Sequence, residues 1–472
     1  MKKEDEIAAT NKLLRLIRGE KDLSDKPTGR GFLEAGEEKA DAPADPAEGG
    51  EIYPFGSQPN KSDLPPESSS DLDFSAEVER KEYPSDEPKA FDSASTQGAS
   101  PGSRSEEQGG REGHFSSQRF LSAATLDGEE IYRRQGEIKG NIKSTLGIDI
   151  GSRYIKYVQI QRRMNKYYLI SWGIIKNANH KPSDWSSSIG TLRGLFSAAP
   201  LAHTRVISAV GGSSVIVRHI KFPPLSNKEI EESIRWEAKS YVPFPLRDVN
   251  IDYQILGRSA KNKQMDVLLV AVTKKLLQEH LDMLQSIQLK ASVVDINSLA
   301  LVNAFSANNP LKDERAVVLL DIGASTTILN IYKKDDLYLT RDIPIAGDAF
   351  TNAIQKEKQI SFQEAESIKH DKNFDLNIIR PTLDNLTKEI RRSLIYYDNQ
   401  TSRRGFSRLV LTGGSCRMAG LVSYFSEELG LAVEIANPFQ AVQIDPRKFA
   451  QDELQFFSPQ MALAFGLASR VN

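Results

Sequence analysis

Cysteine is almost absent from this sequence of 472 residues, in which Cys416 is the single example. One cysteine cannot form a disulfide within the chain, so we expect a reducing compartment. Long apolar runs are also missing, because the longest ones, such as 267–272, have only the length of a strand. A membrane-spanning helix needs roughly 20 apolar residues, and we therefore expect no transmembrane segment. The six histidines lack the spacing of metal ligands, which argues against a transition-metal site.

The sequence also lacks an excess of charge of either sign, since it has 61 basic and 63 acidic side chains and a formal net charge of -2. This balance gives no reason to expect a nucleic-acid partner. The average hides two regions, because 21–120 hold 11 basic and 22 acidic side chains, whereas 121–472 carry a net charge of +8. The acidic region has 10 Pro, 11 Gly and 15 Ser but only 12 Ile, Leu, Val or Phe. It cannot bury enough apolar surface to offset its ordering entropy, so we predict a disordered arm over 21–140.

The first 20 residues differ from this arm. Ile7, Leu13 and Leu16 lie among the basic Lys12 and Arg15, a pattern typical of a short amphipathic helix. Such a helix would suit docking on a partner or a membrane surface, and a frayed terminus is the alternative.

Beyond the arm, strand-like and helix-like segments alternate. Ser226 and Glu229 have the spacing of a capping box that starts a helix, as do Ser361 and Glu364. A strand-rich start followed by helices occurs twice, which predicts two α/β domains that face one another. The expected strands are 145–150, 156–160, 166–172, 206–210, 215–222, 249–256, 266–272 and 291–296 in a first domain at 141–310, then 316–320, 327–332, 337–343, 408–411 and 432–435 in a second at 311–472.

Two loops repeat the same residues. Asp149 lies at the end of the first predicted strand and Gly151 in the turn after it, and Asp321 and Gly323 follow a strand of the second domain. A glycine at a tight bend exposes backbone N–H groups that suit a phosphate oxygen, and Lys156 on the returning strand would reach the same anion. One such hairpin is usually only a turn. A pair on facing domains would grip both ends of a phosphate chain, with the two aspartates around a hydrated Mg²⁺.

A third element is the turn Gly413-Gly414-Ser415, between a strand and a helix expected near 418–429. Paired glycines let a flat ring approach the backbone, and a plain turn is the alternative. Together the three elements resemble the actin, Hsp70 and sugar-kinase superfamily. This resemblance implies an actin-like ATPase fold of two ribonuclease-H-like domains that binds ATP and Mg²⁺. It assigns catalysis to Asp149, Asp295 and Asp321, Mg²⁺ binding through water to Asp149 and Asp321, and nucleotide binding to Gly151, Ser152, Arg153, Lys156, Gly323, Ala324, Ser325, Thr326, Gly347, Glu366, Lys369, Gly413, Gly414 and Ser415.

The stretch 225–245, with Arg-Trp-Glu-Ala at 235–238 and two prolines near its end, narrows the resemblance to the PilM family of type IV pilus assembly proteins, over about 144–470. This implies a cytoplasmic protein at the inner membrane, with an FtsA-like inserted subdomain at about 215–288. The implied partner is the cytoplasmic N-terminal tail of a PilN-like membrane protein, with other pilus assembly proteins and self-association as further contacts. A tryptophan off the apolar stripe 230, 234, 238 and 241 suggests a peptide groove, and its burial is the alternative. The residues assigned to the partner are Arg235, Trp236, Tyr241 and Phe244.

One departure from the superfamily bears on activity. Ser325 stands where actins carry another glycine, so the backbone approaches a γ-phosphate less freely, and we expect ATP binding with at most slow hydrolysis. A sugar-kinase-type phosphotransferase is an alternative, but no sugar-binding cluster is visible. An FtsA-like polymerising membrane tether is another, and only the helix at 1–20 would supply its membrane contact.

Overall fold

The computed structural model describes residues 121–126, 129–177, 183–197, 201–259, 264–309, 315–333, 336–401 and 405–470. The helix expected at 1–20 and the arm up to residue 120 lie outside the described residues.

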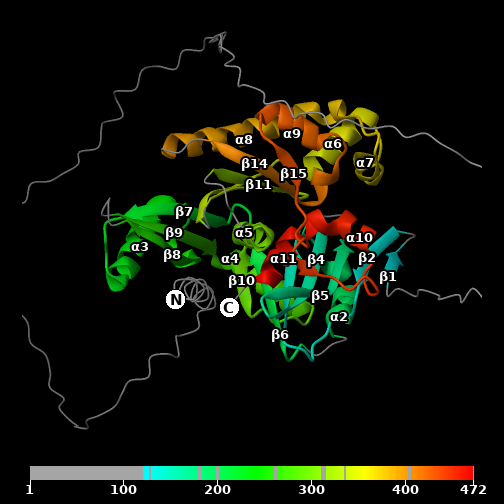
Figure 1. The fold of residues 1–472 in the computed structure, drawn as a ribbon, viewed down its shortest axis with the longest axis horizontal. Coiled ribbons are helices and arrows are strands. Elements are labelled where there is room, and N and C mark those ends of the chain that lie inside the picture. The colour runs from blue at the N-terminus through cyan, green and yellow to red at the C-terminus, as the bar shows by residue number, and fades with distance from the viewer. Residues whose placement is uncertain are drawn as a thin grey trace, which may run out of the picture. The chain divides into compact units, whose positions relative to one another are not determined.

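The first lobe is built on an eight-stranded sheet of order β1-β2-β5-β4-β3-β6-β10, with β16 parallel to β5 (Figure 1). β3, β4 and β5 form an antiparallel meander, and β6 runs parallel to β3 and to β10. Parallel strands with apolar residues on both faces require cover on both sides, which the helices of this lobe provide. The strands are β1 (Leu121–Leu126), β2 (Glu129–Gln135), β3 (Ser144–Ile150), β4 (Tyr154–Arg163), β5 (Lys166–Lys176), β6 (Thr204–Val210), β10 (Val293–Ile296) and β16 (Val442–Gln443).

The last helix of the chain returns to this first sheet. Every residue of α11 (Ala462–Ser469) is buried, and the helix contacts β3, β4 and α5 (Asn297–Asn308). A Cβ atom on Gly466 would lie 1.8 Å from the carbonyl oxygen of Ala300, so only glycine permits this approach. The other helices of the lobe are α2 (Ile189–Ser197), α4 (Lys274–Ser286) and α10 (Gln451–Phe457).

Two predicted boundaries of the main lobes differ from the structure. Residues 121–126 and 129–135, predicted as part of the arm, form β1 and β2 and extend the first sheet through the pairing of β2 with β5. The second domain was predicted to run to 472, yet β16 and α11 complete the first lobe. The cause is the same in both cases, because the pairing partners lie far away along the chain.

The second lobe has a five-stranded sheet of order β13-β12-β11-β14-β15. In Figure 1, α6, α8 and α9 lie over this sheet, and their apolar residues form one core cluster with β11, β12 and β14. Pro381 lies in the first turn of α8, as its fixed φ angle favours. The elements are β11 (Ala316–Ile322), β12 (Thr327–Lys333), β13 (Asp336–Ile343), α6 (Gly347–Lys358), α7 (Phe362–Lys369), α8 (Arg380–Gln400), β14 (Phe406–Thr412), α9 (Leu421–Leu429) and β15 (Val433–Ile435).

A small subdomain is inserted between β6 and α4. It consists of a three-stranded sheet, β7-β9-β8, and the helix α3, which share a separate core cluster. The Ser226–Glu229 capping box starts α3 as predicted. The insertion ends earlier than the predicted residue 288, because Leu284 of α4 belongs to the core of the first lobe. The bounds are β7 (Val215–Phe222), α3 (Asn227–Tyr241), β8 (Val249–Ser259) and β9 (Gln264–Thr273).

Candidate functional site

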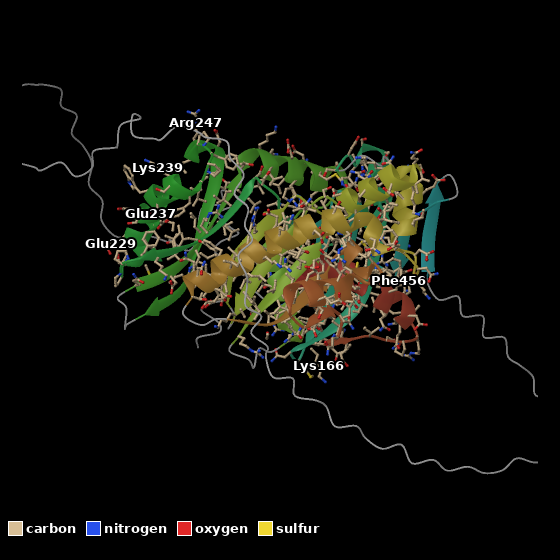
Figure 2. All side chains as sticks on the ribbon, turned by 90° about the horizontal axis from the view of Figure 1, so that it is seen from above. Lys166, Glu229, Glu237, Lys239, Arg247 and Phe456 are labelled. Carbon is tan, nitrogen blue, oxygen red and sulfur yellow. The ribbon has the colours of Figure 1, made fainter. Side chains whose placement is uncertain are left out.

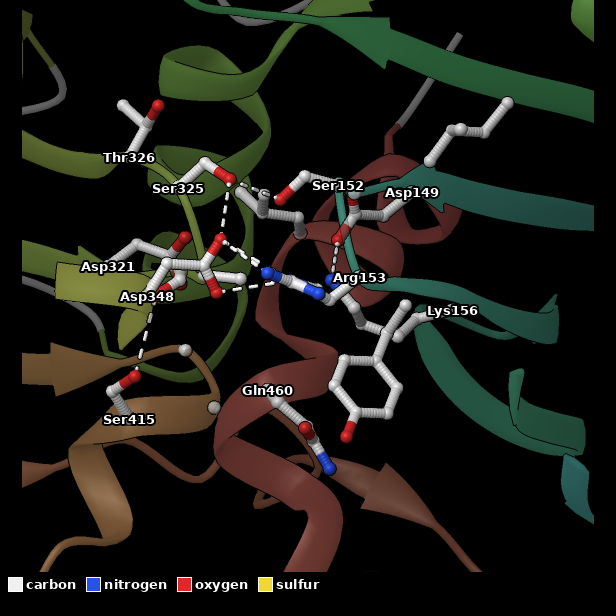
Figure 3. A pocket seen from close by; sticks show the side chains of 18 of the residues that line it. Asp149, Ser152, Arg153, Lys156, Asp321, Ser325, Thr326, Asp348, Ser415 and Gln460 are labelled. Carbon is white, nitrogen blue, oxygen red and sulfur yellow. Dashed lines mark hydrogen bonds and ion pairs between the residues drawn. The ribbon is translucent and has the colours of Figure 1, made fainter. Parts of the chain in front are cut away.

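A cavity of about 600 Å³ is lined by residues of both lobes (Figure 3). The loops after β3 and β11, the helix α7 and the turn after β14 all contribute to its wall. The structure therefore brings together segments that are far apart in sequence, including most of those predicted to bind nucleotide. The predicted residues that line it are Asp149, Gly151, Ser152, Arg153, Lys156, Asp321, Gly323, Ala324, Ser325, Thr326, Glu366, Lys369, Gly413, Gly414 and Ser415.

The first loop is a tight turn between β3 and β4. The N–H of Gly151 donates to the carbonyl oxygen of Tyr154 at 3.0 Å, and a Cβ at Gly151 would lie 2.8 Å from that oxygen. Lys156 pairs across the strands with Asp149, and its Nζ lies 2.6 Å from Asp149 Oδ2. The loop thus places an ion-paired carboxylate and a lysine beside a bend that lines the cavity.

The second loop repeats this construction between β11 and β12. The N–H of Gly323 donates to the carbonyl oxygen of Thr326 at 3.1 Å, and a Cβ at Gly323 would again lie 2.8 Å from that oxygen. Asp321 accepts a hydrogen bond from Thr412 Oγ1 at 2.7 Å. Burial raises the pKa of Asp321 to about 6, although the bond from Thr412 and the charge of Lys156 oppose the rise.

The start of α6 is attached to the second loop. The N–H groups of Gly347 and Asp348 donate to the carbonyl oxygens of Gly323 at 3.0 Å and Ala324 at 2.7 Å. Gly347 does not itself line the cavity. A Cβ there would lie 2.5 Å from Ser415 Oγ, so glycine at 347 lets α6 and the turn after β14 approach the loop.

The buried Lys369 and the partly exposed Glu366 of α7 form an ion pair beside this helix. Lys369 Nζ lies 2.6 Å from Glu366 Oε2 and also donates to Thr351 Oγ1 at 2.9 Å. Burial lowers the pKa of Lys369. Burial opposes ionisation of Glu366, but hydrogen bonds from His370, Lys369 and Thr351 outweigh it and lower the pKa of that carboxyl group. The pair is therefore an anchored polar wall of the cavity.

The turn after β14 is the third wall. Gly413 has a φ of +87°, and a Cβ there would lie 2.3 Å from the carbonyl oxygen of Ile322, so this position requires glycine. Ser415 is buried, and the turn continues to Arg417, whose guanidinium carbon lies 4.2 Å from the ring centre of Phe456. The buried Nη1 of Arg417 has no hydrogen-bond partner among the described residues. Arg417 also lines the cavity.

Arg417 was not among the predicted residues. Its position in the sequence could have indicated it, because Arg417 closely follows the Gly413-Gly414 turn at which a nucleotide ring was expected to lie. Asp348 and Asp342 also line the cavity without having been predicted. Asp342 accepts a hydrogen bond from the N–H of Gly212 at 2.7 Å, and burial raises its pKa. No sequence pattern marks these two aspartates.

The catalytic role predicted for Asp295 is not supported. Asp295 is 1% exposed and lies outside the cavity lining. Its Oδ2 pairs with Arg470 Nη1 at 2.5 Å, and its Oδ1 accepts the N–H of Ile296 at 2.7 Å. Because both oxygens are engaged by buried partners, this carboxylate holds the C-terminal residues against the sheet and is not placed to orient water.

Asp149 and Asp321 remain compatible with a hydrated Mg²⁺. The described residues hold no group of three or more His, Cys, Asp or Glu side chains placed to bind a metal ion directly. The two carboxylates line one cavity, and the buried Asp321 lacks a cationic side chain within ion-pairing distance among the described residues. Two hard oxygen donors at some distance suit an ion that keeps most of its water.

The residues predicted to bind a partner lie on or just after α3 of the inserted subdomain. Trp236 is 72% exposed, and Lys239 Nζ lies 3.8 Å from its ring centre. Figure 2 places Lys239 and Glu237 at the outer side of this subdomain. Arg235 is exposed, and Phe244 packs partly on the subdomain core. Tyr241 was expected in the packed stripe with Ile230, Ile234 and Ala238, but it is 38% exposed.

Two lobes that each present an Asp-x-Gly loop to one cavity define the class of actin-like ATPase folds. Within this class the chain belongs to the family of the type IV pilus assembly protein PilM, whose family model matches residues 147–472. Residues 225–245 had already indicated this family.

A solved structure agrees with this assignment, and the chain is also similar to cell division proteins. The structure described as the PilM-PilN type IV pilus biogenesis complex is 29% identical with a TM-score of 0.63, covering 70% of this chain and 98% of that one. The cell division protein FtsA of Bacillus subtilis (strain 168) is 22% identical over 359 residues, which is 64% of this chain and 80% of that protein. FtsA of Pseudomonas aeruginosa is 30% identical over 174 residues, 31% of this chain and 42% of that protein. Among the described residues no helix has both the length and the apolar character needed to cross a membrane.

Proposed function

We propose that this protein is the ATP-binding component of a type IV pilus assembly complex, and that it binds the N-terminal tail of a PilN-like membrane protein. The pair of identically built loops at Asp149 and Asp321, which face one cavity, is the observation that carries the nucleotide half of the proposal. Family membership and the PilM-PilN complex support the partner half.

In this proposal the two loops hold the phosphates. Lys156 supplies a positive charge from the first lobe, and loop N–H groups that are not used within the turns supply hydrogen bonds. Asp149 and Asp321 would hold a hydrated Mg²⁺, which would neutralise phosphate charge. The cation would also compensate the buried Asp321, whose raised pKa reflects the unfavourable ionisation of a buried carboxyl group.

The opposite end of the cavity would hold the nucleoside. Gly413 and Gly414 let a ring lie close to the backbone, and Arg417 offers the unsatisfied Nη1. Glu366 and Lys369 form a polar wall that suits ribose hydroxyl groups. We propose slow hydrolysis at most, because the buried pairing of Asp295 with Arg470 removes the expected water-orienting carboxylate from the cavity.

The partner surface would be the outer side of α3. Trp236 is a large exposed aromatic ring with a lysine over its face, and such rings commonly anchor protein interfaces. The subdomain also contacts the second lobe, since His219 of β7 stacks on Tyr338 of β13 with ring centres 5.9 Å apart. A change in the angle between the lobes would therefore move the subdomain. By this movement the nucleotide state would alter the affinity for the partner.

Calorimetric titration of the full-length protein with Mg-ATP tests the nucleotide half. We expect saturable binding and an upward shift of the melting temperature. Absence of both would overturn the ATP-binding proposal.

Binding of the N-terminal peptide of the PilN-like protein tests the partner half. Trp236→Ala should weaken binding at least about tenfold, the usual effect of losing an interface hot spot. Tyr396→Ala is the matched control, because Tyr396 on α8 is 57% exposed but lies in another lobe. Equal binding by wild type and both variants would exclude Trp236 from the interface. If the wild type did not bind the peptide, the partner proposal would be overturned.

A further inference from the structure

The first phosphate loop and the second lobe are joined by a charged contact. Arg153 Nε lies 3.1 Å from Asp348 Oδ1 and 3.3 Å from Oδ2, and Arg153 Nη2 lies 3.3 Å from Oδ2 (Figure 3). The guanidinium carbon is 4.4 Å from the ring centre of Phe362 on α7. Arg153 belongs to the first lobe and both contacts belong to the second, so this one side chain spans the cavity.

A second, neutral contact lies beside this ion pair. Ser325 Oγ of the second phosphate loop donates to Ser152 Oγ at 2.8 Å and lies 3.3 Å from Asp348 Oδ2. The carboxylate of Asp348 is therefore held by a residue of each phosphate loop. All four residues line the cavity proposed to hold a nucleotide.

The chemistry of this cluster suits a phosphate as well as a carboxylate. A guanidinium group forms the same forked, charge-assisted hydrogen bonds with a carboxylate and with a phosphate. Serine hydroxyl groups likewise donate to either anion. A phosphate carrying negative charge and the carboxylate of Asp348 would repel each other if both stayed beside Arg153.

We propose that Arg153 reads the terminal phosphate of a nucleoside triphosphate, and that Asp348 holds the guanidinium when this phosphate is absent. A triphosphate replaces Asp348 at Arg153 and releases the contact between the lobes, whereas a diphosphate leaves it in place. The inference rests on the nucleotide site proposed above and adds to it the residue that distinguishes the two nucleotides.

The test is a calorimetric comparison of Mg-ADP with a non-hydrolysable Mg-ATP analogue on full-length protein. Arg153→Gln should lower affinity for the triphosphate about tenfold, the order expected for lost charge-assisted bonds, and change affinity for the diphosphate much less. Arg153→Lys keeps the charge without the fork and should fall between. Arg163→Gln changes an exposed arginine at the far end of β4, the strand that follows Arg153, and should change neither affinity.

Asp348→Asn gives the reciprocal result. Removal of the competing carboxylate should raise affinity for the triphosphate several-fold, and this gain should shrink in the double variant with Arg153→Gln, because Asp348 acts through Arg153. Circular dichroism establishes that each variant is folded.

The outcomes separate the two proposals. If wild type binds neither nucleotide, the ATP-binding proposal fails and this inference fails with it. If wild type binds both and Arg153→Gln leaves the ratio of the two affinities unchanged, the nucleotide site stands and the role of Arg153 is overturned. Fully additive effects in the double variant would also overturn it.

Discussion

The two Asp-x-Gly loops contain the same hydrogen-bonded turn, but their aspartates have different partners. In the first lobe Asp149 lies opposite Lys156 on the neighbouring strand, and in the second lobe the residue opposite Asp321 is Ile328. Asp321 has instead a hydroxyl donor, Thr412, from β14. Both lobes therefore keep the turn. The residue opposite the aspartate on the neighbouring strand determines whether the carboxylate has a cationic partner or is buried without one.

The largest expected effect comes from removing the cation of the first loop. Lys156→Met should lower the free energy of unfolding by about 3 kcal/mol, because it leaves Asp149 buried without its partner. Denaturant unfolding measures this loss. Lys166→Met, at an exposed position on β5, is the control and should change stability little. Equal stability of both variants would show that the Lys156–Asp149 pair contributes nothing.

Asp321 of the second loop should make the free energy of unfolding depend on pH. The pKa of Asp321 is raised to about 6 in the folded protein, so the folded state binds the proton more tightly than the unfolded state. This contribution to the free energy of unfolding is fully present below the ordinary pKa of an aspartate. It is lost as pH rises through about 6, and the total loss is up to about 3 kcal/mol. Asp321→Asn should remove this loss. Parallel stability curves for wild type and variant between pH 4 and 7 would contradict the raised pKa.

The shared backbone predicts equal costs at the two glycines. Gly151→Ala and Gly323→Ala each place a Cβ 2.8 Å from a carbonyl oxygen, and each should cost about 2 kcal/mol of stability. Thermal or denaturant unfolding of the two variants gives the comparison. A large cost at one glycine and none at the other would break the structural equivalence of the loops.

The smallest effect should come from Thr412→Val, which keeps the shape of the side chain but removes the donor to Asp321. Stability at neutral pH should fall by about 1 kcal/mol. The pKa of Asp321 should also rise further, so the pH at which stability is lost moves upward. A downward move would show that the hydroxyl does not favour the ionised carboxylate.

The sequence predicted the features that are local. Apolar segments on either side of a glycine turn indicated the strands that carry both loops, and the serine–glutamate spacing indicated the starts of α3 and α7. The glycines of the loops followed from what a tight turn requires. The duplicated motif predicted that two distant segments would face one cavity, which the structure confirms.

The features that the sequence did not predict depend on contacts between distant segments. The pairing of Asp295 with Arg470 joins residues that are 175 positions apart in the sequence, and no local pattern indicates it. Asp348 joined the site only because α6 starts beside the second loop. β1 has only two large apolar residues and β2 is mostly polar, so neither was predicted as a strand, whereas the pairing of β2 with β5 places both in the sheet.

The central claim is that both loops hold one nucleotide, and amide hydrogen exchange with and without Mg-ATP tests it most directly. Exchange should slow at residues 150–156 and at 322–327 together, at the same nucleotide concentration. Protection of one loop alone, or of neither under saturating nucleotide, would contradict a site shared by the two lobes.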